Sequence, residues 1–234
     1  MDNLRSREME GMIADIERET RYTSDTTGKD ALDGRVMAAI RACPRHAFVP
    51  VEMVGLAYAN HPLQIGCGQT ISQPFIVALM TDLLNLPELA SVLEVGTGSG
   101  YQSAVLAQLA HRVYSIEIVP SLAYQAAERF ANLGITNIET HCGDGYLGWP
   151  EYAPYDGIIV TAAAPRIPPP LIEQLKPGAR LVIPVGMRYM PQQLLVVEKG
   201  LDGNLRHRNT LPVAFVPLTG THAEAGDSSS TWGF

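Results

Sequence analysis

A short glycine-rich turn limits the folds open to this chain more than any other segment of its sequence. Residues 94–100 read Glu-Val-Gly-Thr-Gly-Ser-Gly and follow an apolar run at 91–96, which predicts a strand; residues 100–110 predict a helix. Glycine adopts positive φ and lets the backbone approach a ligand, and the first N–H groups of a helix can bind a carboxylate or a phosphate. Taken alone, the turn is also compatible with a simple tight connection.

Strands and helices alternate after residue 90. The predicted helices are 100–110, 120–133 and 170–175, the last ending at Pro177-Gly178, and the predicted strands are 91–96, 112–118, 137–141, 155–161, 180–185, 193–199 and 211–216. Such alternation with short links predicts a mostly parallel, doubly wound sheet, whose ligands bind at the carboxyl ends of the strands. The last two strands are expected to pair as a hairpin through Asp202-Gly203.

The first third of the chain predicts helices and irregular structure. We expect an amphipathic helix at 6–20, a loop at 21–30, a short helix at 33–42, irregular structure at 44–73 and a helix from Pro74 to about Leu86. Residues 220–234 are rich in Gly, Ser and Thr and predict a mobile tail. These patterns predict three parts: a cap at 1–73, a Rossmann-like core at 74–219 and a tail at 220–234.

Composition excludes several classes of function. The formal net charge is −7, so bulk attraction to nucleic acid or to an anionic membrane is not expected. No run approaches the roughly 18 apolar residues of a membrane span, and no signal peptide is expected. Cys43, Cys67 and Cys142 lack the spacing of a disulfide framework or a metal site, which predicts a cytoplasmic protein without metal.

The residues around the glycine turn indicate which ligand it binds. A dinucleotide site needs a third glycine where Tyr101 stands, so the pattern is closer to sites for S-adenosylmethionine. Glu117 ends the next strand and can accept hydrogen bonds from ribose, although it could also be a solvated strand-end charge. Asp144 lies between two glycines after a further strand and can bind adenine, although Asp-Gly is also a common turn pair. An NAD-dependent oxidoreductase therefore stays open as an alternative.

Several longer motifs resemble the protein-L-isoaspartate O-methyltransferase family. The similarity runs from about residue 33 to 219. Its motifs are Arg45–Pro50 (RHAFVP), Gly68–Pro74 (GQTISQP), Leu93–Tyr101 (LEVGTGSGY), Gly143–Pro150 (GDGYLGWP), Thr161–Pro165 (TAAAP), Leu175–Gly178 with Leu181–Gly186, and Phe215–Thr219 (FVPLT). His61 and Gln64 depart from the family pattern, which leaves peptide selectivity open.

The resemblance implies a class I S-adenosylmethionine-dependent methyltransferase with an N-terminal helical extension and antiparallel C-terminal strands. Its substrate would be the free α-carboxylate of L-isoaspartyl residues in damaged proteins and peptides, and the methyl ester would begin repair through a succinimide. Two further alternatives stay open: a methyltransferase acting on another small molecule, and a binding module that kept the pocket without the activity. We expect neither nucleic acid nor membrane as partners, and a monomer.

The resemblance also assigns site residues. Ser72 is the expected catalytic residue, because its hydroxyl can position the substrate carboxylate; a helix-capping role is the competing interpretation. The expected cofactor-binding residues are Thr70, Ile71, Gly96, Thr97, Gly98, Ser99, Gly100, Glu117, Ile118, Asp144 and Gly145. The expected substrate-binding residues are Ser72, Ala163, Ala164, Pro165 and Thr219.

Overall fold

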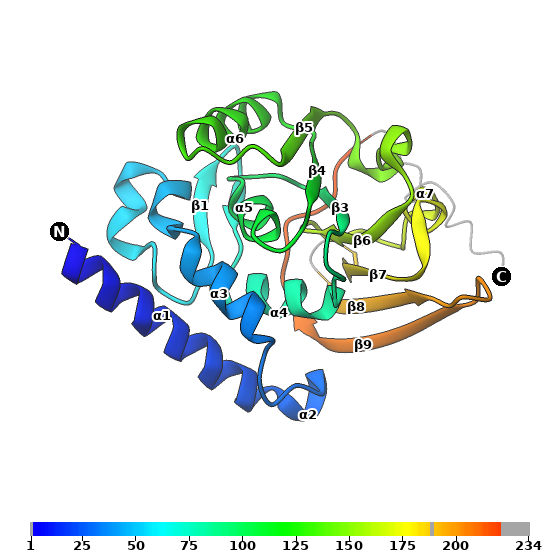
Figure 1. Ribbon diagram of the computed structural model, residues 1–234, viewed down its shortest axis with the longest axis horizontal. Helices are drawn as coiled ribbons and strands as arrows, with labels where there is room; N and C mark the ends of the chain where they lie inside the picture. The colour runs from blue at the N-terminus through cyan, green and yellow to red at the C-terminus, as the bar shows by residue number, and fades with distance from the viewer. Residues whose placement is uncertain (1, 188–189, 221–234) are drawn as a thin grey trace, which may run out of the picture.

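A seven-stranded sheet forms the centre of the computed structural model, which describes residues 2–187 and 190–220 (Figure 1). The expected tail beyond Gly220 lies outside the described residues. The strands are β3 (Ser91–Val95), β4 (Arg112–Glu117), β5 (Ile138–Cys142), β6 (Tyr155–Val160), β7 (Leu175–Val185), β8 (Gln192–Lys199) and β9 (Leu205–Val213). They lie in the order β5-β4-β3-β6-β7-β8-β9. The first five strands of this order are parallel, whereas β8 and β9 are antiparallel additions.

The strand order reverses between β3 and β6. From β3 the chain proceeds outward to β4 and β5, then returns to place β6 on the other side of β3. In open α/β sheets this switch point leaves a crevice at the carboxyl ends of the two strands, where ligands bind. The glycine turn that follows β3 and Thr161 that follows β6 therefore meet at the same edge of the sheet.

Helices pack against the sheet, and the first of them form an N-terminal extension of the fold. They are α1 (Asp2–Tyr22), α2 (Ser24–Thr27), α3 (Gly34–Ala42), α4 (Pro74–Leu84), α5 (Tyr101–Ala107), α6 (Pro120–Asn132) and α7 (Pro169–Glu173). Short 3₁₀ turns η1 (Arg45–Phe48), η2 (Val51–Leu56), η3 (Gly145–Leu147) and η4 (Pro150–Tyr152) lie between them. This arrangement confirms the predicted doubly wound α/β fold with a helical N-terminal extension and antiparallel C-terminal strands.

Alternating residues of the central strands pack on opposite faces of the sheet. Val92 and Ile159 belong to one buried cluster, while their neighbours Leu93 and Ile158 belong to another. Side chains of a strand point to opposite faces in turn, so a sheet covered on both sides requires apolar residues at consecutive positions. The near-continuous apolar runs of β3 and β6 are the sequence signature of that burial.

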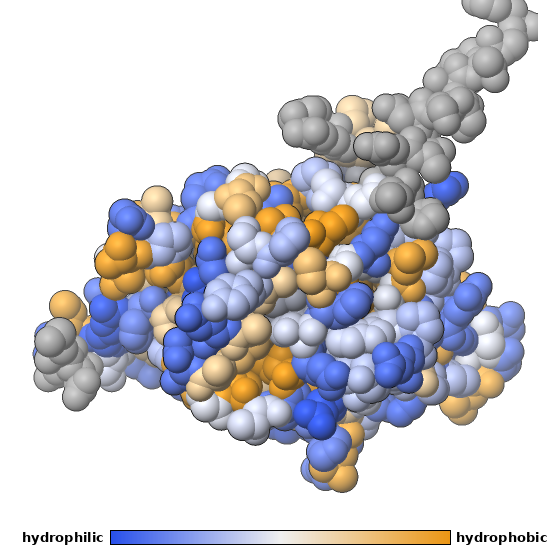
Figure 2. All heavy atoms as spheres, turned by 90° about the horizontal axis from the view of Figure 1, so that it is seen from above, coloured by the Kyte–Doolittle hydropathy of each residue, from blue (hydrophilic) through white to orange (hydrophobic). Residues whose placement is uncertain are grey.

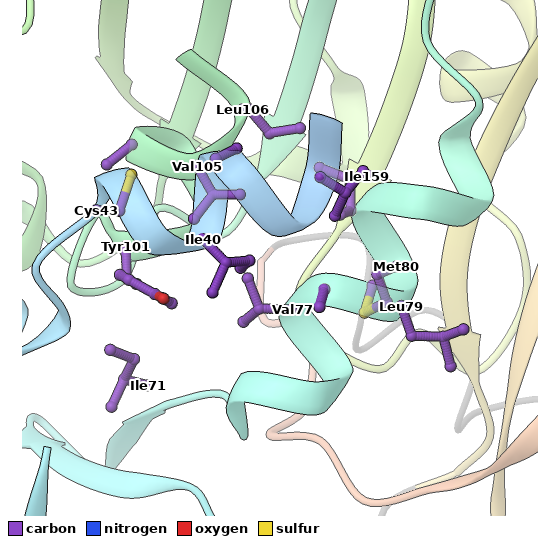
Figure 3. Close-up of a cluster of buried hydrophobic side chains, with 14 of the residues drawn as sticks. Ile40, Cys43, Ile71, Val77, Leu79, Met80, Tyr101, Val105, Leu106 and Ile159 are labelled. Atoms are coloured by element: carbon purple, nitrogen blue, oxygen red, sulfur yellow. The ribbon is translucent and has the colours of Figure 1, made fainter. Parts of the chain in front are cut away.

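The cluster on the Val92 face joins helices that are far apart in the sequence. Figure 3 shows Ile40 of α3, Val77 of α4 and Val105 of α5 pointing toward one another. Met12 and Ile16 of α1 are buried in the same cluster. The N-terminal helices thus share a core with the sheet. The division at residue 73 remains a prediction.

Several local predictions were wrong. Helix α1 continues to Tyr22 and α2 occupies Ser24–Thr27, where a loop was expected. The irregular stretch holds a hairpin of β1 (Leu63–Gly66) and β2 (Gln69–Ile71). Pro177-Gly178 lies inside β7, at a register irregularity opposite β6, rather than ending a helix. The hairpin through Asp202-Gly203 forms, but its second strand, β9, begins at Leu205 and not at residue 211. Residues 205–210 are mostly polar, and they form a strand because they pair with β8.

Apolar residues on the surface are dispersed. Figure 2 shows small hydrophobic patches separated by hydrophilic residues on the face seen from above. Exposed apolar side chains include those of Tyr22, Val51, Leu89 and Leu201, which lie far apart in the sequence. Among the described residues, no helix combines the length and the apolar character that crossing a membrane requires.

Candidate active site

The glycine turn between β3 and α5 owes its shape to three residues with positive φ. Gly96, Gly98 and Gly100 have φ of 100°, 53° and 87°. A Cβ at Gly96 would lie 2.4 Å from Thr161 Oγ1, and one at Gly100 would lie 2.6 Å from the Phe130 ring. At Gly96 and Gly100 a side chain is excluded both by conformation and by space, whereas at Gly98 the positive φ alone disfavours one.

Glu117, at the end of β4, fixes the glycine turn through hydrogen bonds. Its Oε2 accepts a hydrogen bond from Gly98 N at 2.7 Å, and its Oε1 accepts one from Val119 N at 2.9 Å. The Glu117 carbonyl oxygen accepts from Gly143 N at 3.0 Å, which brings the next turn alongside. The structure therefore brings together the glycine turn, Glu117 and the Gly143–Gly145 segment, as the sequence predicted.

Asp144 and Gly145 lie beside the end of β3. Asp144 Oδ1 accepts from Tyr146 N at 3.0 Å, which caps the short turn η3. A Cβ at Gly145 would lie 2.4 Å from Val95 Cγ1, so glycine is required for this approach. Gly220 also packs against the Asp144 carboxylate. Ile118 follows Glu117 and is half-buried.

A small cavity opens above the glycine turn, and a groove of about 460 Å³ lies next to it. Thr70, Ser72 and Thr161 line both, so the two spaces adjoin at these hydroxyl groups. The cavity is otherwise lined by Ile71, Val77, Gly96, Thr97, Gly98, Ser99, Tyr101 and Gln102. The groove is otherwise lined by Glu19, Pro62, Gln73, Ile76 and residues 211–216. Gly100, Glu117, Ile118, Asp144 and Gly145 line neither space.

Ser72 does not cap helix α4. The residue at the cap position is Gln73, whose side chain makes no capping bond, and Asn60 Oδ1 accepts from Phe75 N at 3.0 Å. Among the described residues, Ser72 Oγ has no hydrogen-bond partner. The capping interpretation of Ser72 therefore finds no support, and its hydroxyl is available where the groove meets the cavity.

A buried carboxyl group lies beneath the turn. Glu94 is inaccessible to solvent, and its Oε2 accepts hydrogen bonds from the hydroxyl groups of Ser103 and Ser115. Ser115 Oγ is in turn 2.6 Å from Thr97 Oγ1, which reaches the cavity wall. Burial raises the pKa of Glu94 to about 8, although the two serine hydroxyls oppose the shift. The carboxyl group is therefore mainly neutral at pH 7.

The predicted substrate-binding residues are placed differently from one another. Ala163 and Ala164 are buried, because Ala163 pairs with the chain at Val216 and Leu218 while Ala164 N donates to Pro184 O at 3.1 Å. Pro165 and Thr219 are exposed. None of these four residues lines the groove that contains Ser72. Their role in substrate binding remains a prediction.

Sequence reasoning missed several residues of the cavity and the groove. Thr161 Oγ1 donates to Gly96 O at 2.6 Å and joins the ends of β6 and β3. Its position at the end of an apolar strand was a usable signal. Tyr101 and Gln102 follow the turn directly and also line the cavity. Glu19 carried no local signal, and Phe215 belonged to a motif of the family without pointing to the groove, because only packing brings α1 and the segment after β9 there.

Comparison with models of known protein families shows which family this chain resembles. Residues 25–223 match the family model described as protein-L-isoaspartate(D-aspartate) O-methyltransferase (PCMT). The chain belongs to this family. The matched segment covers most of the chain and leaves α1 outside it.

Curated relatives support the same family membership. The chain is 58% identical over 211 residues to protein-L-isoaspartate O-methyltransferase 2 of Syntrophobacter fumaroxidans, covering 90% of this chain and 85% of the relative. It is 59% identical over 209 residues to the protein of the same name from a Polaromonas species, covering 89% of this chain and 99% of the relative.

Solved structures share the fold. A protein-L-isoaspartate O-methyltransferase structure aligns with a TM-score of 0.79 at 28% identity, over 91% of this chain and 66% of that longer chain. A protein from Plasmodium falciparum, solved in complex with S-adenosyl-L-homocysteine, aligns with a TM-score of 0.75 at 23% identity, over 89% of this chain and 97% of that one. None of these matches supports the alternative of an NAD-dependent oxidoreductase or of a methyltransferase for another small molecule.

Proposed function

We propose that this chain transfers the methyl group of S-adenosylmethionine to the free α-carboxylate of L-isoaspartyl residues in damaged proteins and peptides. Family membership supports the reaction. One observation supports placing the reaction here. Thr70, Ser72 and Thr161 line both the cavity over the glycine turn and the groove. A cofactor bound in the cavity and a peptide bound in the groove would therefore come together beside these three residues.

The cavity is small, about 30 Å³, and its polar lining is proposed to contact the amino-acid end of the cofactor. Hydroxyl groups of Thr70, Thr97 and Ser99 and the amide of Gln102 can hydrogen-bond an ammonium and a carboxylate, while glycine leaves the backbone of the turn accessible. Glu117 ends β4, and Asp144 follows the neighbouring strand β5 by two residues, so both lie next to the turn, where they would hold the ribose and the adenine. When bound, the cofactor supplies a methyl group on a positively charged sulfur.

Ser72 is proposed to orient the acceptor. Its hydroxyl can donate to one oxygen of the substrate carboxylate and direct the other toward the cavity. A carboxylate with a pKa near 3.5 is ionised at neutral pH, so the nucleophile needs no general base. Ser72 itself is not a nucleophile, because no base among the described residues hydrogen-bonds its Oγ.

The groove is proposed to hold the peptide chain. Its walls are largely apolar, with Ile76 of α4 on one side and the segment 211–216 on another, which would exclude water around the reacting carboxylate. The expectations that Ala163, Ala164, Pro165 and Thr219 contact the peptide, that the chain is a cytoplasmic monomer, and that nucleic acid and membranes are not partners also remain proposals.

A pair of peptides tests the proposed function. The peptides are identical except that one carries an isoaspartyl linkage and the other a normal aspartyl linkage, and both are mixed with the protein and labelled S-adenosylmethionine. We expect base-labile label on the isoaspartyl peptide alone. Equal labelling of both peptides, or of neither, would contradict the proposal.

Replacement of Ser72 by alanine tests the role of its hydroxyl. A single positioning hydrogen bond contributes on the order of 1–3 kcal/mol, so Ser72→Ala should lower kcat/KM for the isoaspartyl peptide by roughly 5- to 150-fold. Binding of S-adenosylhomocysteine, measured by calorimetry, and thermal unfolding should stay close to wild type. Wild-type methylation by the variant would rule out the assignment.

A further inference from the structure

A carboxylate from outside the matched family segment reaches the groove. Glu19 lies in the last turns of α1, three residues after the buried Ile16, and is half-buried on the side of the helix that faces the protein. It lines the same groove as Ser72, but not the cavity over the glycine turn. Glu19 thus lies beside the groove proposed for the peptide rather than beside the cavity proposed for the cofactor.

Two neutral amide groups hold this carboxylate in place. Asn60 Nδ2 donates to Glu19 Oε2 at 2.6 Å, and Gln73 Nε2 donates to the same oxygen at 3.0 Å. Gln73 follows Ser72 directly in the chain, and Asn60 also accepts from Phe75 N at the start of α4. These contacts orient the Glu19 side chain without neutralising its charge.

Neither the second carboxylate oxygen of Glu19 nor its negative charge is paired with another described group of the groove. Among the described residues, Glu19 Oε1 has no hydrogen-bond partner. The other described residues that line the groove are all uncharged. A fixed, partly dehydrated carboxylate attracts a cation more strongly than a solvated one, because the surrounding protein screens the charge less. It repels an acidic side chain for the same reason.

We infer that Glu19 determines substrate specificity by binding a cationic side chain, lysine or arginine, that neighbours the isoaspartyl residue. This inference rests on the proposed function. The reacting carboxylate belongs at Ser72, which borders the cavity, and Glu19, which borders only the groove, contacts an adjacent residue of the same peptide. Helix α1 thereby becomes part of the substrate site.

Matched peptides and variants test this specificity. Three isoaspartyl peptides differ only in one residue, lysine, glutamine or glutamate, placed before or after the isoaspartyl position in two series. The wild-type protein should show the highest kcat/KM with lysine and the lowest with glutamate in at least one series. An ion pair of about 1 kcal/mol corresponds to roughly a 5-fold preference for lysine over glutamine. Raising the salt concentration should reduce the preference.

Glu19→Gln keeps the shape of the side chain and an oxygen that accepts from Asn60 and Gln73. We expect it to remove most of the preference among the three peptides. Glu17→Gln is the matched control, since Glu17 lies on the same helix, is exposed and does not line the groove. This control should keep the wild-type order. Thermal unfolding and binding of S-adenosylhomocysteine establish that each variant is folded.

The outcomes separate the inference from the proposed function. If the protein methylates the isoaspartyl peptides without any charge preference in either series, the inferred role of Glu19 is wrong, while the proposed function stands. An equal loss of kcat/KM for all three peptides in Glu19→Gln would also overturn it, because the residue would then serve only to hold Asn60 and Gln73. Failure of the wild-type protein to methylate any isoaspartyl peptide would instead reject the proposed function itself.

Discussion

Glu94 lies beneath the glycine turn, where its carboxyl group meets hydroxyl groups rather than a cation. Its pKa is raised to about 8 by burial, from an ordinary value of 4.5. Between these two pH values the unfolded chain has lost the proton and the folded chain has kept it. The folded state therefore binds more protons, and stability falls as the pH rises through this window.

Glu94→Gln should remove this pH dependence. Glutamine resembles the neutral acid in shape, and its oxygen can accept from Ser103 and Ser115. Measured by urea unfolding from pH 4.5 to pH 9, the wild-type protein should lose stability relative to the variant up to about pH 8, by on the order of a few kcal/mol, and then level off. Parallel stability curves for the two proteins would show that the Glu94 pKa is not raised.

The residues of the turn show what could be predicted at this scale. The positive φ of Gly96, Gly98 and Gly100 was implied by the sequence, because glycine recurs where a strand turns sharply into a helix. The neutral state of Glu94 was not implied. A glutamate before a glycine turn gives no sign of its burial, which depends on Ser103 and Ser115 from two other elements.

Element boundaries were predicted well where a local signal marks them. Pro74 begins α4 and Pro120 begins α6, as expected for proline in a first helical turn. The hairpin of β1 and β2 was missed because it is short and Cys67 adopts a φ of 52° at its turn, a conformation that is uncommon outside glycine. Gly66 and Gly68, which flank Cys67 and also have positive φ, were a usable turn signal.

Helix α3 should depend on its N-terminal cap. Asp33 Oδ1 accepts a hydrogen bond from Arg35 N at 2.7 Å at the start of the helix. Asp33→Ala should lower the free energy of unfolding by about 1 kcal/mol, measured by urea denaturation. Asp33→Ser is the control, since serine also caps and should restore most of the loss. Equal losses in both variants would show that the cap does not stabilise α3.

Helix α1 belongs to the core of the whole molecule. Met12, Ile13 and Ile16 are buried in the cluster that also contains Leu79 and Val92. An amphipathic helix was predicted at this position, but its charged sequence did not reveal which surface it would cover. Since α1 shares a core with α4 and the sheet, the N-terminal helix and the sheet should unfold together.

Ile16→Ala tests this shared core. Removal of a fully buried isoleucine side chain leaves a cavity and costs about 2–5 kcal/mol. We expect one unfolding transition at lower urea, with fluorescence and circular dichroism coinciding. Leu4→Ala is the control on the same helix, because Leu4 is exposed and its loss should have little effect. Separate transitions for the two probes would contradict a single core.

The amino-acid sequence was sufficient to predict the doubly wound α/β fold, the glycine turn, the family and the proximity of Glu117 to Asp144. These features follow from local signals: apolar runs, the backbone freedom of glycine, and motifs that stand in a characteristic order. The folded structure was needed to show that Ser72 and Thr161 line both the cavity and the groove, that Ala163 pairs with the C-terminal segment, and that Glu19 lines the groove. Such contacts join segments far apart in the chain, and they are set by how helices and strands pack in the core.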